Sequence, residues 1–366
     1  MKIDVLQTNL LTGIKTVSRF LSTKPQLPIL SCILLEARNS EIWLTATDLN
    51  IGMRQKIAGS VAEEGSCVIP AKVFSELVSS LTGSVSLVLS GLSLSVTSNQ
   101  TKSVVNTFPE QDFPPFPQVE GETLTLPASI LSDAVNYVTF TSSKDENRPI
   151  LTAVLFALSE QSHIVATDGY CMSLLEPALS VKEPKQILFP AKAINEIEKV
   201  VVSQKVDTVM LSFSQGAKQV FFSLPSAQIV LRTLEGEFPN YKAVIPKEFA
   251  IEVSVDADEL QHHIRSAMIF SAEGSSIVQI EVFPDQMSVS AHSSLLGEYT
   301  SSLSAKSNTQ ESLKIAFNGR YLLEFLQRIA GEECQIYCND PLKPVRLSCK
   351  KIPQVTYIAV PFKLSS

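Results

Sequence analysis

The chain has 366 residues, a net charge of −7 at pH 7 and an apolar fraction of 45%, which suits two or three folded domains and excludes a disordered chain. Its first residues carry Lys2 and Asp4 where a signal peptide needs an apolar run. No stretch approaches the roughly 20 apolar residues of a membrane helix. We therefore expect a cytosolic protein without a membrane span.

The acidic balance argues against DNA binding, because DNA-binding proteins usually carry a basic surface. Only a local concentration of Lys and Arg on one surface would permit it. The six cysteines form no C-x-x-C pair, and we interpret them as reduced core thiols without a metal site. They are Cys32, Cys67, Cys171, Cys334, Cys338 and Cys349.

The first predicted elements are an N-terminal strand and a helix with Leu10, Ile14 and Val17 at helical spacing, capped by Thr8 and Asn9. Strands over 29–37 and 42–46 follow. A second helix follows the Pro-Ala-Lys block at 70–72. A hairpin then alternates apolar and serine residues on both sides of a Ser-Gly turn at 90–91.

This unit recurs twice along the chain. Thr-Ala-Thr-Asp-Leu at 45–49 returns as Val-Ala-Thr-Asp-Gly at 165–169, and Ile-Pro-Ala-Lys at 69–72 returns as Phe-Pro-Ala-Lys at 189–192. A looser copy of the second block, Phe-Asn-Gly-Arg, lies at 317–320. Several blocks in one order at one spacing indicate internal triplication.

The predicted fold class is therefore α+β, with three repeated domains at 1–120, 121–247 and 248–366. Each domain should contain two helices and six to eight mostly antiparallel strands. The first helices of the second and third copies should begin near Ala128 and Asp256.

Cations occupy equivalent positions in the three copies. Lys72, Lys192 and Arg320 are each the second residue of a predicted second helix, and Lys199 and Arg328 lie about two turns further along theirs. If the copies surround one axis, these side chains face it and could bind phosphates without reading bases. The alternative is that they only solvate exposed helix faces.

Five sequence blocks resemble the bacterial DNA sliding clamp, the beta subunit of DNA polymerase III: Leu27-Pro28-Ile29-Leu30, Ala46-Thr47-Asp48-Leu49, Ala166-Thr167-Asp168-Gly169, Phe238-Pro239-Asn240-Tyr241 and Tyr357-Ile358-Ala359-Val360-Pro361-Phe362-Lys363-Leu364. The resemblance runs from end to end. It implies the DNA clamp fold, with two chains joined head to tail in a ring around duplex DNA. It also implies a non-catalytic processivity factor that needs no cofactor. The implied partners are the DNA polymerase III alpha subunit, the clamp loader, repair polymerases, mismatch-repair proteins and ligase.

The resemblance further implies a pocket that binds short peptides of these partners between the second and third domains. Its lining residues would be Leu151, Thr167, Gly169, Tyr170, Cys171, Met172, Pro239, Val244, Ile358 and Val360, and then Asn318, Tyr321, Leu342, Pro344, Pro361 and Phe362. The alternative for most of the apolar ones is ordinary core packing. Tyr-Cys-Met at 170–172 replaces the family's frequent His-Arg-Leu, which leaves the peptide preference open.

By the same resemblance, Lys24 and Arg148 are loop cations that contact DNA, together with Lys72, Lys192, Lys199 and Arg320. Ile269 and Phe270 would lie on one side of the subunit contact and Val105 on the other.

Two other functions are open alternatives. An enzyme would need a catalytic motif, but H-E-x-x-H, G-x-S-x-G and G-x-G-x-x-G are all missing from the sequence. The recurring Asp48 and Asp168 could bind a metal ion or, more simply, form a turn at a strand end. A monomeric structural or ligand-binding protein made of three β-rich modules is the other alternative.

Overall fold

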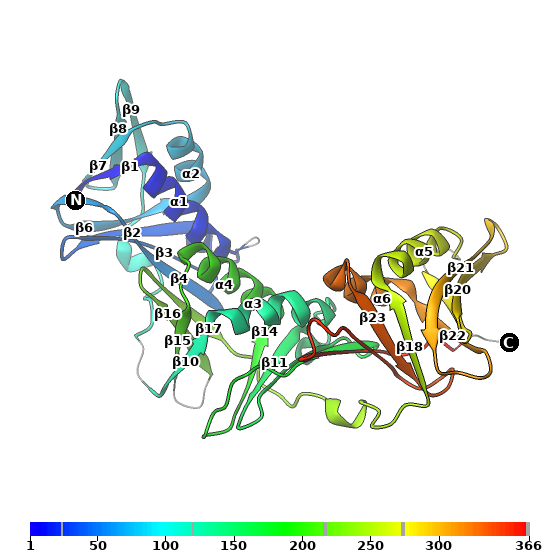
Figure 1. Ribbon diagram of the computed structural model, residues 1–366. Coiled ribbons are helices and arrows are strands. Elements are labelled where there is room, and N and C mark those ends of the chain that lie inside the picture. Colours follow the sequence, from blue (N-terminus) through cyan, green and yellow to red (C-terminus); the bar gives the residue numbers. More distant parts are fainter. Residues whose placement is uncertain (23–24, 119–120, 215–217, 272–274, 364–366) are drawn as a thin grey trace. The chain divides into compact units, whose positions relative to one another are not determined.

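The computed structural model describes residues 1–22, 25–118, 121–214, 218–271 and 275–363 (Figure 1). Its internal contacts divide the chain into two compact units. Unit 1 comprises Met1–Ser129 with Asn195–Thr233, and unit 2 comprises Ile130–Ile194 with Leu234–Ser366. The division passes through the second repeat, which contributes strands to both units.

Unit 1 contains two antiparallel sheets. The five-stranded sheet has the order β5-β1-β7-β8-β9. These strands are β1 (Lys2–Leu6), β5 (Gly59–Glu63), β7 (Ser84–Ser90), β8 (Ser93–Ser98) and β9 (Thr101–Asn106). The eight-stranded sheet has the order β10-β15-β16-β17-β4-β3-β2-β6. Its strands are β2 (Cys32–Arg38), β3 (Glu41–Thr47), β4 (Ile51–Ile57), β6 (Gly65–Pro70), β10 (Thr123–Pro127), β15 (Thr208–Phe213), β16 (Gln219–Leu224) and β17 (Ala227–Arg232).

Unit 2 contains one continuous sheet of 12 strands, in the order β14-β11-β12-β13-β25-β24-β23-β18-β21-β20-β19-β22. The strands from the second repeat are β11 (Ala153–Leu158), β12 (His163–Thr167), β13 (Cys171–Leu175) and β14 (Lys185–Pro190). Those from the third are β18 (Ile251–Asp256), β19 (Ile277–Val282), β20 (Gln286–Ser293), β21 (Gly297–Ser307), β22 (Leu313–Asn318), β23 (Glu333–Cys338), β24 (Val345–Ser348) and β25 (Val355–Ala359).

Each of the α-helices directly follows a strand, two in each repeat, which confirms the prediction of two helices per domain. They are α1 (Gln7–Val17), α2 (Ala71–Ser79), α3 (Ala128–Tyr137), α4 (Ala191–Gln204), α5 (Ala257–Ile269) and α6 (Gly319–Leu326). Single 3-10 turns occur at η1 (Ser18–Phe20), η2 (Pro28–Ser31), η3 (Glu110–Asp112), η4 (Thr139–Thr141), η5 (Pro149–Thr152), η7 (Tyr241–Ala243) and η8 (Gln327–Ile329).

Helix α1 shows how the helices pack on the sheets. It buries Leu10, Ile14 and Val17, the residues whose spacing predicted it. Gly13 lies so close to the sheet that a Cβ there would come within 2.9 Å of Leu44 Cδ1. The predicted cap at Thr8 and Asn9 was wrong, because the helix already begins at Gln7 without a side-chain cap.

The first repeat contains the nine strands β1 to β9, one more than the predicted maximum of eight. Between β4 and β5 the chain passes from the eight-stranded sheet to the five-stranded sheet. Gly59 lies at this crossing, where a Cβ would come within 2.8 Å of the backbone oxygen of Asp4. In the third repeat the single long strand β21 takes the place of this pair: its first part pairs with β20 and its last residues pair with β18.

The recurring Thr-Asp blocks form the same turn in both copies. Asp48 Oδ1 accepts hydrogen bonds from the backbone N–H of Asn50 and Ile51, both at 2.8 Å. Asp168 Oδ1 accepts from Tyr170 at 2.8 Å and Cys171 at 2.9 Å. Each carboxylate is therefore used to close a strand-end turn, as the simpler of the two interpretations predicted.

The repeats are joined by antiparallel strand pairing. In unit 1, β17 of the second repeat pairs with β4 of the first, with Val230 opposite Gly52. In unit 2, β25 of the third repeat pairs with β13 of the second, with Ile358 opposite Met172. The last strand of each of these repeats is thus hydrogen-bonded to the strand that follows the Thr-Asp turn of the preceding repeat.

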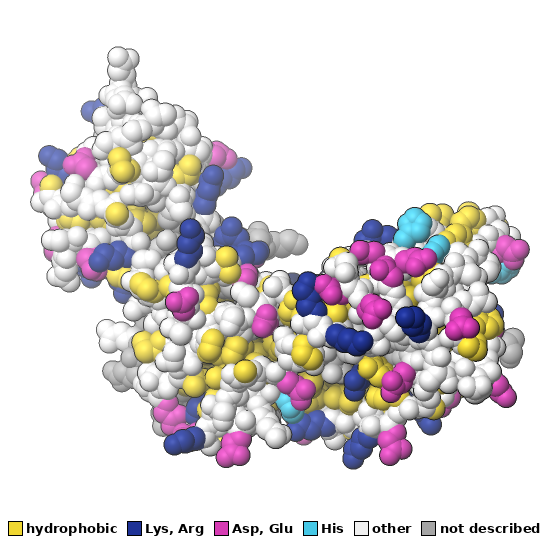
Figure 2. All heavy atoms as spheres, in the orientation of Figure 1, with side chains coloured by type: hydrophobic (Ala, Val, Ile, Leu, Met, Phe, Trp, Pro, Cys, Tyr) yellow, Lys and Arg dark blue, Asp and Glu magenta, His cyan; other side chains and the backbone are white. Residues whose placement is uncertain are grey.

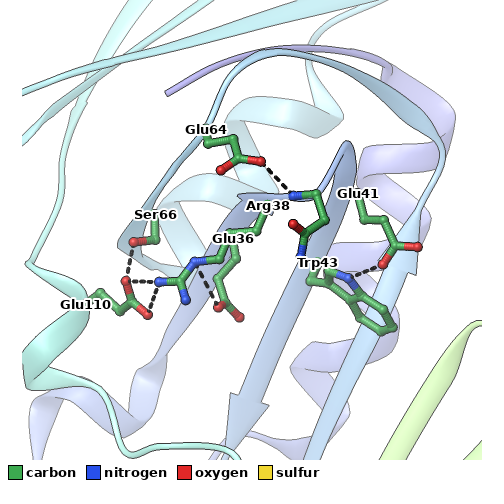
Figure 3. A network of polar contacts seen from close by, with 8 residues as sticks. Glu36, Arg38, Glu41, Trp43, Glu64, Ser66 and Glu110 are labelled. Carbon is green, nitrogen blue, oxygen red and sulfur yellow. Dashed lines mark hydrogen bonds and ion pairs between the residues drawn. The ribbon is translucent and has the colours of Figure 1, made fainter.

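A polar network holds the segment after β9 against the first repeat (Figure 3). Glu110 accepts hydrogen bonds from Arg38, at 2.6 Å, and from Ser66. Arg38 also lies 3.9 Å from Glu36, and the Trp43 indole donates to Glu41 at 2.9 Å. The contacts of Glu110 with Arg38 of β2 and Ser66 of β6 hold the η3 turn against these two strands.

Candidate functional site

The residues predicted to form the peptide pocket all belong to unit 2 and gather around the β13–β25 pairing. Met172 and Ile358 lie opposite each other in these strands; because the neighbouring Tyr357 stacks on Phe325 of α6, Ile358 and Met172 lie on the sheet face away from that helix. Phe238 and Tyr241 cover them, so that Met172 is 4% exposed and Ile358 is 1% exposed. Both residues are part of the core beneath the predicted pocket, which was the alternative interpretation for such apolar positions.

Several other members of the predicted set are large apolar side chains at the surface. The exposed fractions are 57% for Tyr170, 42% for Val244, 59% for Leu342 and 49% for Phe362. Isolated exposed apolar residues are ordinary, but a group of them around one strand junction is typical of an interaction surface.

Backbone and ring contacts tie this surface together. Val360 N donates to Tyr170 O at 2.9 Å, and Phe362 N donates to Ala316 O at 2.7 Å. The rings of Tyr170 and Tyr321 stack with centroids 6.3 Å apart. The C-terminal segment therefore runs between the second repeat and β22 of the third.

The remaining members lie in the same region. Gly169 and Pro239 are exposed, Thr167 and Cys171 are buried, and the others are half-buried: Leu151, Asn318, Tyr321, Pro344, Val360 and Pro361. Thr167 supports the turn below Tyr170, because its hydroxyl accepts from Gly169 N at 3.0 Å. Asn318 caps α6 by accepting from Arg320 N.

Two phenols lie under this surface. The Tyr357 hydroxyl donates to Tyr321 O at 2.8 Å, and its ring stacks on Phe325 of α6 at 4.9 Å. Burial raises the pKa of Tyr357 well above its ordinary value. Burial, followed by the Asp168 carboxylate, also raises the pKa of Tyr321. Both groups therefore stay protonated at neutral pH and act as structural hydrogen-bond donors.

The predicted DNA-facing cations of the second helices are all exposed: Lys72, Lys192, Lys199 and Arg320. Lys192 pairs with Glu146 at 3.1 Å, and Lys199 pairs with Glu196 at 2.6 Å. Such exposed ion pairs contribute little to stability, so a phosphate can replace the carboxylate at small cost. Dark-blue side chains gather on the side of unit 1 that carries α1 and α2, whereas blue and magenta are mixed over α5 and α6 (Figure 2).

The other predicted cations, Arg148 in a loop and Arg328 in the 3-10 turn η8 after α6, differ in their surroundings. Arg148 is exposed and pairs with Asp145 at 3.2 Å. Arg328 instead lies 3.5 Å above the Phe140 ring and donates to Asn136 O at 2.6 Å, so it links the second and third repeats. Lys24 lies outside the described residues.

The predicted subunit-contact residues divide into exposed and buried ones. Ile269 is 68% exposed, and the neighbouring Phe270 stacks on Tyr299 of β21 with centroids 6.0 Å apart. Val105 is only 7% exposed, because it faces Leu94 across the β8–β9 pairing. Its neighbour Val104 is 62% exposed and points outward. The alternation of the hairpin could have identified Val104 as the exposed residue of this pair.

The described residues contain no group of three or more metal-ligating side chains of the His, Cys, Asp and Glu types. All six cysteines are buried and free, as predicted. Burial raises the pKa of Cys67 to about 12 and that of Cys338 to about 11, so these thiols remain protonated. No helix in the part of the chain that the structure describes is long and apolar enough to cross a membrane.

Comparison with known proteins gives one consistent result. Three family models, described as the N-terminal, central and C-terminal domains of the DNA polymerase III beta subunit, match residues 1–117, 125–240 and 242–363. The beta sliding clamp of Synechococcus elongatus is 28% identical, over 100% of both chains. That of Staphylococcus aureus is 25% identical, over 99% of both.

Solved structures agree over the full length. The DNA polymerase III beta subunit of Thermotoga maritima is 27% identical, with a TM-score of 0.92 over 100% of both chains. The beta subunit of the Streptococcus pyogenes DNA polymerase is 25% identical, with a TM-score of 0.94 over 100% of both chains.

Met172 and Phe362 belong to the same predicted pocket but differ in burial, so their replacement should affect stability differently. Met172→Ala should lower the free energy of unfolding by about 2–4 kcal/mol, because it leaves a cavity under Phe238 and Tyr241. Phe362→Ala should change it by less than about 0.5 kcal/mol, because the ring is half in solvent. Urea unfolding followed by circular dichroism measures both; equal effects would contradict this division into core and surface.

Proposed function

We propose, from the premise that this chain belongs to the DNA polymerase III beta subunit family, that two copies join head to tail in a ring around duplex DNA. As a beta sliding clamp, the chain is a processivity factor of DNA polymerase III and a non-catalytic subunit. The proposal has three parts: the ring, its contacts with DNA and its docking surface for partner peptides.

The main support for the ring is an unpaired strand edge in the first repeat and another in the third repeat. Strand β9 is the last strand of the five-stranded sheet, so one of its edges has no partner among the described residues. In β21, Gly297–Ser304 pairs with β20 alone. These two strands are the equivalents of β17 and β4, which pair with each other inside unit 1. Pairing β9 of one chain with β21 of another would therefore repeat the junction used twice within each chain.

The same equivalence predicts the register. Val104 holds the position in its hairpin that Val230 holds in β16–β17. Glu298, opposite His292, holds the position that Gly52 holds opposite Thr47. Because Val230 pairs with Gly52, Val104 should lie opposite the partner's Glu298, with Lys102 diagonal to that carboxylate.

Exposed apolar residues lie beside both free edges. Val104 is in β9, and Phe270, next to Ile269, stacks on Tyr299 of β21. In the predicted register Val104 shares a sheet face with Glu298, whereas Val105 shares the opposite face with Tyr299 and the Phe270 ring, so contact of Val105 with this group would remove apolar surface from water in each of two equivalent interfaces. A head-to-tail contact closes into a ring only when its rotation permits, and a ring leaves neither edge exposed.

The cations of the second helices would then line the hole. Lys72, Lys192, Lys199 and Arg320 are exposed side chains that can contact phosphates without reading sequence. Such contacts are weak enough to allow sliding, while the closed ring prevents dissociation. Arg148 and Lys24 remain proposed loop contacts to DNA.

The surface around Tyr170, Val244, Leu342 and Phe362 is the proposed docking site for partner peptides, above the buried Met172 and Ile358. Family membership implies association with DNA polymerase III. Its alpha subunit, the clamp loader, repair polymerases, mismatch-repair proteins and ligase are proposed as peptide donors. Tethering a polymerase in this way raises its effective concentration at the primer end. Domain limits at 1–120, 121–247 and 248–366 are retained as part of this proposal.

Retention on circular DNA tests the ring. Clamp placed by a clamp loader on nicked circular DNA should stay bound after gel filtration and should be lost when the circle is cut. Val104→Glu places a like charge opposite Glu298 and should weaken dimerisation by about 100-fold or more, so this variant should not be retained.

Val88→Glu is the matched control, since Val88 is an exposed valine of the same sheet, in β7. It should behave like the unchanged protein. Retention of the clamp after the DNA is cut, or a dimer affinity that Val104→Glu does not change, would refute a ring closed by pairing of β9 with β21.

Salt dependence tests the cations. Lys72→Gln and Arg320→Gln should each reduce the slope of log Kobs against log salt concentration by about one, since each removes one phosphate contact. Fluorescence anisotropy with a short linear duplex at low salt measures this slope. Lys247→Gln, an exposed lysine outside the helices, should leave it unchanged; equal slopes in all three variants would remove these residues from the DNA surface.

A further inference from the structure

A cation lies in the sheet of unit 2 directly beside the floor of the proposed docking surface. Arg346 of β24 is opposite Ile358 of β25, and Ile358 is in turn opposite Met172 of β13. Residues directly opposite each other in paired strands point to the same face of a sheet, so Arg346 shares the face of these two floor residues. It lies next to the floor, one strand further from β13.

Two aromatic rings hold the guanidinium of Arg346. Its central carbon lies 4.5 Å from the centroid of the Tyr337 ring and 5.4 Å from that of the Phe249 ring. Phe249 is fixed in turn by Asn339, whose side-chain amide accepts a hydrogen bond from the backbone just after Phe249, at 2.8 Å, and donates one to the backbone just before it, at 2.9 Å. The charged group is therefore held in a defined position by stacking on rings that are themselves fixed.

The charge of this arginine has no anionic partner. Arg346 is half-buried, yet it forms no hydrogen bond or ion pair with any residue that the structure describes. Nε is the only nitrogen of the side chain that is enclosed without a partner, so the terminal Nη1 and Nη2, which also have none, reach the surface. A carboxylate can bind both terminal nitrogens at once through two parallel hydrogen bonds.

The equivalent positions of the other repeats show that strand pairing at a junction does not need a cation here. In β16 the position is held by Phe221, which is opposite Val230 and 2% exposed. In β8 it is held by Ser95, opposite Val104. A partly buried guanidinium without an ionic partner costs free energy that these side chains avoid. The cation at Arg346 therefore points to an anion supplied by another molecule.

We propose that Arg346 binds the side-chain carboxylate of an aspartate or glutamate in a partner peptide that occupies the docking surface. This inference rests on the proposed docking function and adds to it a preference for acidic peptides. A DNA phosphate is not the expected ligand, because this sheet face lies away from α6, which carries the proposed DNA contact Arg320.

The distances suit a single short peptide. Neighbouring strands lie about 4.8 Å apart and an extended chain advances about 3.4 Å per residue, so a peptide seated over Ile358 reaches Arg346 within about two or three residues. The linker 244–249 spans the same path, since it begins with the exposed Val244 of the docking surface and ends with the Phe249 ring against Arg346.

Peptide selection tests the preference. Random heptapeptides on phage are selected on the unchanged protein, and those that bind Phe362→Ala equally well are discarded, because they bind outside the docking surface. The remaining peptides should carry an acidic residue at a fixed distance from an apolar one. Selection on Arg346→Gln should yield the same apolar residue without the acidic one.

Affinities measured by fluorescence anisotropy make the test quantitative. One selected peptide, amidated at its C-terminus, is compared with the same peptide carrying glutamine in place of the acidic residue. The acidic peptide should bind the unchanged protein about 5-fold more tightly at low salt, and the two should bind Arg346→Gln equally well. Lys343→Gln is the matched control: Lys343 already pairs with Asp340 at 3.2 Å, so its removal should leave the preference unchanged.

Melting temperatures of the variants are measured first. Arg346→Lys keeps the charge but loses the planar pair of donors, and it should keep only part of the preference. This variant decides the question if Arg346→Gln does not fold.

Selected peptides without an acidic residue, or a preference that survives in Arg346→Gln, would overturn the inference and leave the docking surface in place. A preference lost equally in Lys343→Gln would also overturn it, because it would show attraction to net charge alone. If no peptide depends on Phe362, the docking surface itself is contradicted, and this inference with it.

Discussion

Strand pairing across the repeat boundaries is the constraint from which the rest of the structure follows. In both units the last strand of one repeat completes the sheet of the preceding repeat, through β17–β4 and β25–β13. A backbone edge left unpaired in water would invite uncontrolled association. Among the described strands, β9 and the first part of β21 keep an edge without a partner strand, as do the sheet-terminal strands β5, β6, β10, β14 and β22. What distinguishes β9 and β21 is that they are the equivalents of β17 and β4, which pair at a repeat junction, and this equivalence supports the proposed ring.

The same junctions also position the proposed docking surface for partner peptides. The Thr-Asp turn and the strand after it recur at both junctions, but the side chains on them have diverged. Met172 is buried beneath exposed apolar residues at the second junction, whereas the first junction has Gly52 at the equivalent position and a hollow of about 190 Å³ beside it. Repeats that must pair by their backbones can vary in the side chains that cover the pairing, so the two junctions carry different surfaces.

Much of this could be predicted from the sequence, because it depends on local spacing. Repeated blocks located the helices, the strand-end turns and the equivalent cations at Lys72, Lys192 and Arg320. Burial was harder to predict, since it depends on which residues cross over from another repeat. Met172 is covered by Phe238 and Tyr241, which follow much later in the chain, and Val105 faces inward while Val104 faces outward. From the sequence, Arg328 looks like one more of the equivalent helix cations. In the structure, however, its guanidinium packs on the Phe140 ring, which the adjoining repeat supplies.

The most direct test of the account is a disulfide across the predicted contact between chains. A variant with both Val104→Cys and Glu298→Cys should form, on mild oxidation, a covalent species of two chains, since opposite residues of paired strands lie within disulfide reach. The native cysteines are all buried and should not compete. A variant with Val104→Cys and Ser302→Cys, off the predicted register, should stay uncrosslinked. A ladder of longer oligomers, or equal crosslinking in both variants, would contradict a two-chain ring closed by β9 and β21.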